Sequence, residues 1–154
     1  MNLIIFGPPG AGKGTQADFI VNKYNLFQLS TGEVLRNEIK NKTILGREIS
    51  SIINSGILVS DVVVKKLVEN FISDNKYKDR LIFDGYPRNL VQAKTLNELL
   101  EKYNQKIDLV LKLSVSLETI KKRISERLTL ENRADDSEEI AIKRYKTYEK
   151  STEP

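Results

Sequence analysis

The stretch GPPGAGKGT, residues 7–15, decides how the rest of this sequence is interpreted. It nearly matches the phosphate-binding loop pattern G-x-x-x-x-G-K-[ST], because its first glycine and Gly12 have the required spacing and Lys13 follows at once. Where the pattern has Ser or Thr, this sequence has Gly14, and a hydroxyl comes only with Thr15. The stretch is therefore either a damaged phosphate loop or a specialised one.

The surroundings of the loop favour phosphate binding. It follows an apolar run, NLIIF, and leads into KGTQADFIVNKY, which has apolar residues roughly on one side of a helix. The glycines let the backbone turn so that successive N–H groups point inward at phosphates, and Lys13 adds a mobile cation. Thr15 can still supply the hydroxyl for Mg²⁺. A glycine-rich turn without function is the alternative, and the strand, helix and lysine together argue against it.

Three short apolar runs indicate the fold class: Asn2–Phe6, Arg80–Asp84 and Asp108–Leu113. Each is followed by a break and then by a helical pattern. Such alternation predicts an α/β fold with a buried parallel sheet. The length of 154 residues favours one domain with a full core.

Helix signals place further elements between and after these runs. Ser30 or Thr31 can cap one helix, and a second short helix ends near Gly56, so the pair forms an insertion between strands. After the last run, Ser116 caps a helix that continues to about residue 128. The acids of DDSEE stand in the first turn of a final helix, 135–150.

The composition excludes several classes of function. The sequence has no cysteine and no histidine, which removes disulfides, thiolate nucleophiles, imidazole bases and almost every zinc site. No apolar run approaches the roughly 18–20 residues that span a bilayer, and MNLIIF lacks the basic region and cleavage site of a signal peptide, so we expect a cytoplasmic protein. The net charge of +4 suits either nucleic acid or polyphosphates as partners.

Polar residues after the second run add to a phosphate site. In FDGYPR, Asp84 stands at the end of a predicted strand, where ligands bind in open α/β sheets, and Arg88 can reach a phosphate. An aspartate at a strand end is often only a turn former, but beside a phosphate loop it becomes the expected partner of Mg²⁺ through water. Four later arginines also have a suggestive spacing, for which a solvated basic face is the alternative. They are Arg123, Arg127, Arg133 and Arg144.

Five stretches together resemble adenylate kinases, in order and in spacing, over essentially the whole chain. They are GPPGAGKGTQ, STGEVLR, FDGYPRNLVQA, KKRISER and NRADDSEEIAIKRYKTYEKSTEP. In that family the loop runs G-K-G-T, so Gly14 matches the family's own variant. The resemblance implies a P-loop NTPase three-layer fold with a parallel sheet, inserted helices that bind the nucleoside monophosphate, and a minimal lid. It also implies Mg²⁺-dependent transfer of a phosphoryl group from ATP to AMP, which gives two ADP.

The resemblance assigns site residues position by position. The ATP site would comprise Gly10, Ala11, Gly12, Lys13, Gly14, Thr15, Arg123 against the adenine, and Arg127. The AMP site would comprise Thr31, Arg36, Ile57, Leu58, Val59, Gly85, Tyr86, Pro87, Arg88, Gln92, Arg133 and Arg144. The residues expected to act in catalysis are Lys13, Arg88, Arg127, Arg133 and Arg144, with Asp135 and Asp136 orienting the arginines. Thr15 and Asp84 are expected to hold Mg²⁺, the latter through water.

The resemblance also predicts the organisation of the chain. Residues 1–29 and 60–154 form the core, 30–59 the AMP-binding insertion, and 127–137 a short lid. Only LTLEN separates Arg127 from Arg133, which matches the short-lid branch without zinc. Family members continue past the position of Pro154, so we expect the last strand and helix to be missing. Exposed apolar surface beside 108–113, lower stability and weaker ATP binding are then expected.

Other functions remain as alternatives. A catalytically inactive nucleotide-binding fragment is one, and a UMP or CMP kinase is another. The related pyrimidine nucleotide kinases usually have Ala and Asn at the positions of Thr31 and Gln92, which favours AMP. A GTPase is disfavoured because no Asn-Lys-x-Asp stretch is present. We expect a monomer that binds ATP, AMP and ADP and neither nucleic acid nor membrane.

Overall fold

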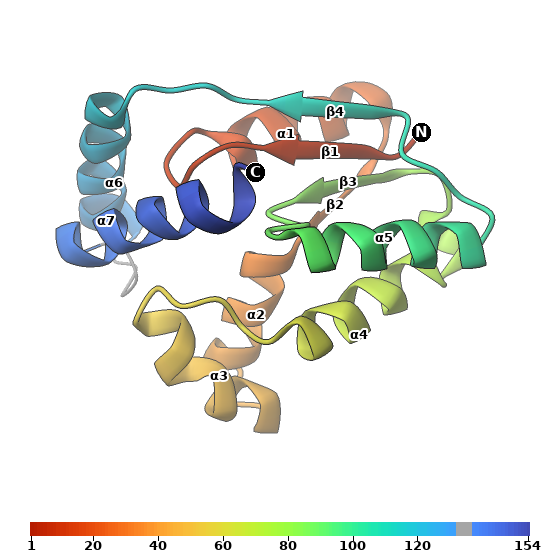
Figure 1. Ribbon diagram of the computed structural model, residues 1–154, viewed down its shortest axis with the longest axis horizontal. Coiled ribbons are helices and arrows are strands. Elements are labelled where there is room, and N and C mark those ends of the chain that lie inside the picture. Colours follow the sequence, from red (N-terminus) through yellow and green to blue (C-terminus); the bar gives the residue numbers. More distant parts are fainter. Residues whose placement is uncertain (132–136) are drawn as a thin grey trace.

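The computed structural model describes the backbone of residues 1–131 and 137–154, and the side chains outside 127–136 and 138. Its centre is a four-stranded parallel sheet in the order β2-β3-β1-β4 (Figure 1). The strands are β1 (Leu3–Phe6), β2 (Phe27–Ser30), β3 (Leu81–Asp84) and β4 (Leu109–Lys112). The helices are α1 (Lys13–Tyr24), α2 (Thr31–Lys40), α3 (Ile44–Asn54), α4 (Asp61–Ile72), the 3₁₀ turn η1 (Asn75–Tyr77), α5 (Leu90–Lys102), α6 (Leu117–Glu131), α7 (Glu138–Thr147) and the π-helical turn η3 (Tyr148–Thr152).

The register of the sheet brings the carboxyl ends of its strands to one edge. Ile4 of β1 pairs with Phe83 of β3 on one side and with Val110 of β4 on the other. Leu29 of β2 pairs with Phe83 from the far side. The loops that follow β1, β2 and β3 therefore leave the sheet next to one another, at the edge where ligands bind in parallel α/β sheets.

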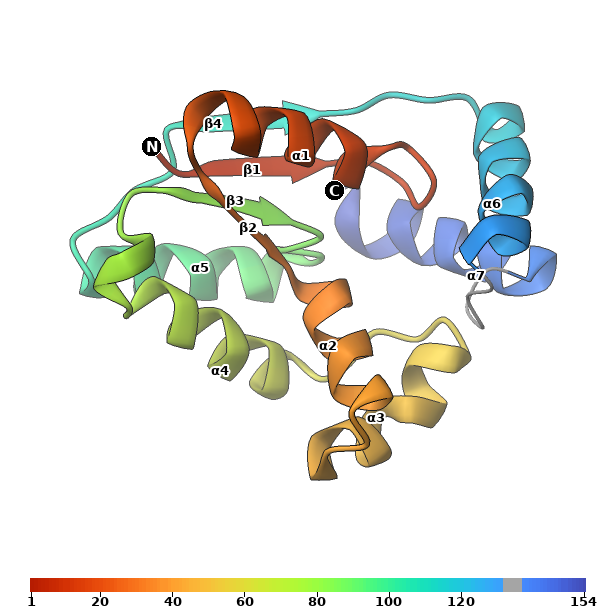
Figure 2. The same ribbon diagram turned by 180° about the vertical axis from the view of Figure 1, so that it is seen from behind.

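Helices cover both faces of the sheet because side chains alternate between them along each strand. Ile4 and Phe83 belong to the larger core cluster, which includes buried residues of α4 and α5. Leu3, Ile5 and Ile82 belong to a second cluster with Ala17 of α1. Figures 1 and 2 show α5 on one face and α1 on the other. The predicted three-layer α/β fold with a parallel sheet is confirmed.

The elements differ from the predictions at three places. The sequence does not predict β2, a strand of four residues that is only partly buried. The helix expected to end near residue 128 continues to Glu131. The final helix begins at Glu138, where the Ser137 hydroxyl accepts a hydrogen bond from the backbone N–H of Ile140, and not at 135. A serine at this position captures a first-turn donor, which fixes the start of the helix.

The inserted helices α2 and α3 pack closely on one another and lie away from the sheet (Figure 2). At Gly46 the two backbones meet, since a β-carbon built there would lie 2.0 Å from the Glu38 carbonyl oxygen. The insertion then returns past α7: Gly56 has φ +71°, and an added β-carbon would lie 3.0 Å from Ile140 Cγ2 and 3.2 Å from Arg144 Cγ. The end of the insertion therefore contacts the helix that carries Arg144.

β4 is the edge strand beside β1. Its Leu109 and Val110 side chains are 49% and 51% exposed, which is the apolar surface that the sequence led us to expect at this strand. Lys112 of the same strand forms an ion pair of 3.1 Å with Glu153, and both side chains are about half exposed. Among the described helices, none has both the length and the apolar content needed to cross a membrane.

Candidate functional site

The glycine-rich loop joins β1 to α1 and turns through two left-handed residues. Gly10 has φ +79° and Gly12 has φ +91°, a region that residues with a β-carbon rarely adopt. Gly12 is also the N-cap of α1, which has 12 residues, so the first N–H groups of the helix face the loop. A helix start with unpaired N–H groups is a site for anions. The sequence thus places a tight glycine turn and a helix N-terminus together at this edge of the sheet.

Two cations lie against the loop. The Lys13 ammonium group donates hydrogen bonds to the backbone carbonyls of Gly7 at 2.8 Å and Pro8 at 3.0 Å. Arg123 of α6 donates from Nη1 to the carbonyl of Ala11 at 3.1 Å. The two side chains therefore fix the carbonyls of Gly7, Pro8 and Ala11 and bring two positive charges against the loop. A positive field at the loop favours a polyphosphate.

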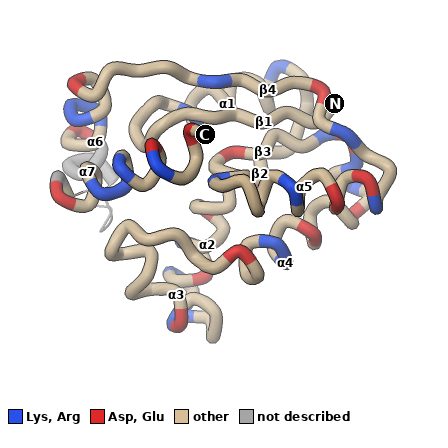
Figure 3. Tube along the Cα trace, viewed as in Figure 1, with Lys and Arg blue, Asp and Glu red and all other residues tan. Residues whose placement is uncertain are grey.

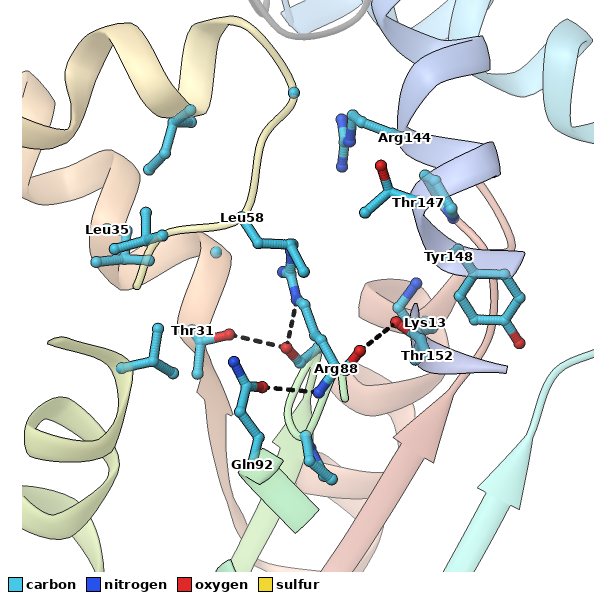
Figure 4. A pocket seen from close by; sticks show the side chains of 18 of the residues that line it. Lys13, Thr31, Leu35, Leu58, Arg88, Gln92, Arg144, Thr147, Tyr148 and Thr152 are labelled. Carbon is cyan, nitrogen blue, oxygen red and sulfur yellow. Dashed lines mark hydrogen bonds between the residues drawn. The ribbon is translucent and has the colours of Figure 1, made fainter. Parts of the chain in front are cut away.

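A second set of polar side chains surrounds the turn after β3 (Figure 4). The Thr31 hydroxyl donates to the Gly85 carbonyl at 3.0 Å, and Arg88 donates from Nε to the same carbonyl at 2.6 Å. The backbone N–H of Arg88 donates to Gln92 Oε1 at 2.7 Å. These bonds hold residues from α2, the β3–α5 loop and α5 around one space.

Gly32 lets two guanidinium groups converge on the start of α2. A β-carbon built on Gly32 would lie 3.1 Å from Arg36 Nη1 and 3.4 Å from Arg88 Nη2. Arg36 comes from the same helix and Arg88 from the loop after β3. Two guanidinium groups at a helix N-terminus make a site suited to a phosphate group.

Two adjoining cavities connect these features. The first, here called the Gln92 cavity, has a volume of about 130 Å³ and includes Thr31, Leu35, Val59 and Gln92 in its lining. The second, here called the loop cavity, has a volume of about 1010 Å³ and includes residues 10–15. Both cavities are lined by Pro9, Lys13, Gly32, Arg36, Gly85, Arg88 and Arg144. Four cationic side chains from four different segments therefore stand where the two cavities meet.

The structure brings most of the predicted site residues to one cavity or the other. The loop cavity is lined by Gly10, Ala11, Gly12, Lys13, Gly14, Thr15, Asp84 and Arg123. The Gln92 cavity is lined by Thr31, Arg36, Ile57, Leu58, Val59, Gly85, Pro87, Arg88, Gln92 and Arg144. The side chain of Arg127 and all of Arg133, Asp135 and Asp136 lie outside the described residues, as do residues 132–136 of the predicted lid.

Tyr86 lines neither cavity. Its side chain is only 1% exposed and belongs to the main core cluster, and its hydroxyl donates to the Gln92 backbone carbonyl at 3.2 Å. Burial first, and then the negative charge of Asp61, raise the pKa of this hydroxyl to about 12. Tyr86 therefore supports the turn after β3 from beneath.

Asp84 and Thr15 contribute oxygen atoms to the loop cavity. Asp84 is 8% exposed, and its Oδ2 accepts a hydrogen bond of 3.0 Å from Gln28 Nε2 on the neighbouring strand. Thr15 lies in the first turn of α1 with its side chain exposed. Carboxylate and hydroxyl oxygens are ligands that suit Mg²⁺, directly or through water. This donor set fits the ion that accompanies ATP.

Sequence analysis missed several residues of the site. Besides Gly32, the Gln92 cavity is lined by Leu35, Thr147, Tyr148 and Thr152, and the loop cavity by Gln28. Gly32 had a signal, because it stands in the first turn of a predicted helix between a cap and an arginine one turn later. Thr147, Tyr148 and Thr152 had none, since the end of α7 and the π-helical turn after it meet residues distant in the chain, and such meetings leave no periodic pattern in the sequence.

Comparison with known proteins places the chain in a family. The family model for adenylate kinase matches residues 5–154. The adenylate kinase of Pelagibacter ubique (strain HTCC1062) is 47% identical over all of this chain and 84% of its own length. That of Prochlorococcus marinus (strain MIT 9301) is 47% identical over 99% of this chain and 81% of its own length. That of Fusobacterium nucleatum is 41% identical over 100% of this chain and 83% of its own length.

These similarities agree with the geometry of the site. The glycine-rich loop, the guanidinium pair at the start of α2 and the four shared cations border two adjoining cavities. The family model covers the segments that carry all of them. On this evidence, the chain belongs to the adenylate kinase family.

Proposed function

We propose that this chain catalyses the reversible transfer of a phosphoryl group from ATP·Mg²⁺ to AMP, which gives two ADP. The observation that carries the proposal is that four cationic side chains line both cavities: Lys13, Arg36, Arg88 and Arg144. A donor bound on the glycine-rich loop and an acceptor bound in the Gln92 cavity would bring their phosphates together between these side chains.

The cations address the main physical obstacle to the reaction. A terminal phosphate carries roughly −1.5 to −2 charges, so two facing phosphate chains repel each other strongly unless cations lie between them. Phosphoryl transfer needs little covalent chemistry from the protein and depends on alignment and on neutralising the charge of the transferring group. A site without histidine or cysteine is adequate for this, because Lys and Arg supply the charge.

Each cavity has a proposed substrate. The ATP phosphates would bind to the N–H groups of residues 10–15, with Lys13 bridging to the transferred group and Arg123 beside the adenine. The AMP phosphate would bind to Arg36 and Arg88 at the start of α2, and its base would lie among Leu35, Val59 and Gln92. Arg127 and Arg133 are proposed to complete the grip on the phosphates from the lid.

The Mg²⁺ ion enters as part of the ATP substrate. When bound it neutralises phosphate charge, and we propose that the Thr15 hydroxyl and, through water, Asp84 hold it. The Gln28 amide, which donates to Asp84 Oδ2, keeps this carboxylate directed toward the loop cavity. No zinc is proposed, since the short lid and the cysteine-free sequence match the branch that lacks it.

The nature of the charged surface favours small nucleotides as partners. Lys and Arg are interspersed with Asp and Glu along the helices (Figure 3), whereas a nucleic-acid surface gathers basic residues on one face. Because one chain supplies both cavities, we propose that it acts as a monomer, and we expect it in the cytoplasm with its substrates.

A coupled assay that follows ADP formation from ATP and AMP tests the proposal, with UMP and CMP as competing acceptors. We expect AMP to be the preferred acceptor, and Lys13→Ala to lower kcat by at least about 100-fold, since an electrostatic contact to the transferred group is lost. Faster turnover with UMP or CMP would make the chain a pyrimidine nucleotide kinase. No turnover with any acceptor would favour an inactive nucleotide-binding chain.

A further inference from the structure

The side chain of Gln92 is held on both sides within the protein. It is 3% exposed, its Nε2 donates to Asp61 Oδ1 at 2.7 Å, and its Oε1 accepts from the backbone N–H of Arg88 at 2.7 Å. Asn89 binds the same aspartate, donating from Nδ2 to Oδ1 at 3.1 Å. The Asn89 side chain also accepts from the backbone N–H of Gln92 at 2.7 Å.

These partners allow only one orientation of the Gln92 amide. A carboxylate can only accept a hydrogen bond and a backbone N–H can only donate one. If the amide turned over, Oε1 would face the Asp61 carboxylate and the NH₂ group would face the Arg88 N–H. Both hydrogen bonds would be lost. Two acceptors would then face each other at Asp61 and two donors at Arg88, and polar groups without partners are costly in a buried place.

We propose that Asp61 is a positioning residue that fixes the Gln92 amide and thereby selects the base of the acceptor nucleotide. Asp61 lines neither cavity and would not touch the substrate. It is the first residue of α4, directly after the predicted AMP-binding insertion, and it joins the start of α4 to the start of α5 through Asn89 and Gln92. This inference rests on the proposed function, because it takes Gln92 to face the base.

The locked amide offers a fixed pattern of hydrogen bonding. Oε1 has a second lone pair and Nε2 has a second hydrogen, so each can make one further bond. Adenine presents an amino donor at N6 beside an acceptor at N1, which pairs with this amide in its fixed orientation. Hypoxanthine has the same ring shape but presents an acceptor at O6 beside a donor at N1. A fixed amide therefore accepts AMP and opposes IMP, whereas an amide that could turn over would take both.

The discrimination of the unaltered protein is the first test. A site whose buried polar groups would be left unpaired by the wrong substrate rejects it strongly, so we expect kcat/KM for AMP to exceed that for IMP by at least about 100-fold. A ratio below about tenfold would overturn the inference without any variant. If AMP itself is not turned over, the proposed function fails. The dissociation constants of AMP and IMP, measured by calorimetry, still test whether the fixed Gln92 amide selects the base.

The second test separates positioning from a role in stability alone. Asp61→Asn has the same shape but can present either an oxygen or an NH₂ group to Gln92, and we expect the AMP to IMP ratio to fall at least about fivefold, mainly through a lower KM for IMP. Asp61→Glu keeps the negative charge that accepts the hydrogen bond, and it should retain most of the AMP to IMP ratio of the unaltered protein. Glu69→Gln is the control, since Glu69 lies on the same helix and pairs with Lys102 away from the cavities.

A purely structural role for Asp61 gives a different result. Asp61→Asn would then lower the melting temperature and change both substrates equally, with the AMP to IMP ratio unchanged, and the inference would be overturned. If Asp61→Asn does not fold, a ratio below about tenfold on the unaltered protein still overturns the inference, and Asp61→Ser takes the place of Asp61→Asn in the comparison with Asp61→Glu.

Discussion

At Gly32 the absence of a side chain has a direct effect on the site. A β-carbon there would approach Arg36 Nη1 to 3.1 Å and Arg88 Nη2 to 3.4 Å, so Gly32→Ala must displace one or both guanidinium groups. The position lies in the first turn of α2, where alanine favours the helix over glycine. We therefore expect KM for AMP to rise about tenfold while the free energy of unfolding stays the same or increases. Steady-state kinetics and denaturant unfolding would measure both.

Gly46→Ala is the contrasting variant. Its β-carbon would lie 2.0 Å from the Glu38 carbonyl oxygen, which cannot move without shifting α2. We expect a loss of about 2–4 kcal/mol in unfolding free energy, as for overpacking between backbones. If Gly32→Ala were as destabilising as Gly46→Ala, the special role of the guanidinium pair would be wrong.

Tyr86 predicts a pH dependence of stability. Its pKa is raised to about 12 from an ordinary value of about 10, so between these two pH values the folded state keeps a proton that the unfolded state releases. The stabilising effect is complete below pH 10 and is lost as pH rises toward 12. The unfolding free energy should fall by up to about 1.4 kcal/mol per pH unit from this group.

Tyr86→Phe isolates the contribution of this hydroxyl. The variant should be less stable at pH 8 by about 1 kcal/mol, since the buried hydrogen bond to the Gln92 carbonyl is lost. Its unfolding free energy should then fall less steeply than that of the unaltered protein between pH 10 and 12, as measured by urea titrations at each pH. Parallel curves in this range would show that Tyr86 is not the group responsible.

At the scale of elements, η3 packs against the loop after β3 and lines the Gln92 cavity. The Thr152 hydroxyl donates to the Arg88 carbonyl at 2.8 Å, which ties this turn and α7 to the loop after β3. This bond links the loop that carries Arg88 to the helical segment that carries Arg144. Figure 4 shows Thr152 on one side of the cavity and Arg88 beside it.

Thr152→Val removes that bond and keeps the shape of the side chain. We expect a three- to tenfold rise in KM for AMP with a smaller change in KM for ATP, because the bonded carbonyl belongs to the residue whose backbone N–H binds Gln92, whereas the glycine-rich loop is untouched. Thr152→Ser retains the hydroxyl and should behave as the unaltered protein. Equal rises for both substrates would indicate a general loosening of the fold instead.

The elements themselves were only partly accessible from the sequence. β1, β3 and β4 could be predicted because their apolar runs are buried or paired in the sheet, and α2 could be predicted from its cap and first-turn acid. β2 could not, because its four residues, FQLS, include two polar ones and form no apolar run, and its conformation depends on pairing with β3. Its residue Gln28, which binds Asp84, was missed with it.

At the scale of the whole molecule, the four cations of the site come from segments far apart in the chain. Lys13, Arg36, Arg88 and Arg144 share a border because the loops after parallel strands leave the sheet at one edge and α7 returns across it. The periodicity of apolar residues within one segment does not indicate which side chains of distant segments come together. The individual residues were therefore predictable from motifs and from resemblance to a family, while the hydrogen bonds of Asp61 and Thr152 required the structure.

The apolar surface at β4 is exposed because this strand lies at the edge of the sheet. Val110 is 51% exposed, whereas the next residue, Leu111, packs against the cluster that contains Leu3 and Ile5. An exposed apolar edge strand promotes association between molecules, and a lysine on it opposes that. Val110→Lys should therefore reduce binding of a hydrophobic dye and raise the concentration at which the protein aggregates, with little change in the urea midpoint.

Leu111→Lys is the matched control on the opposite face of the sheet, and it should lower the urea midpoint of unfolding because it buries a charge. If Val110→Lys left dye binding unchanged, the accessible apolar surface would have to lie elsewhere, with the more exposed Val62, Ile44 and Leu90 as the next side chains to replace.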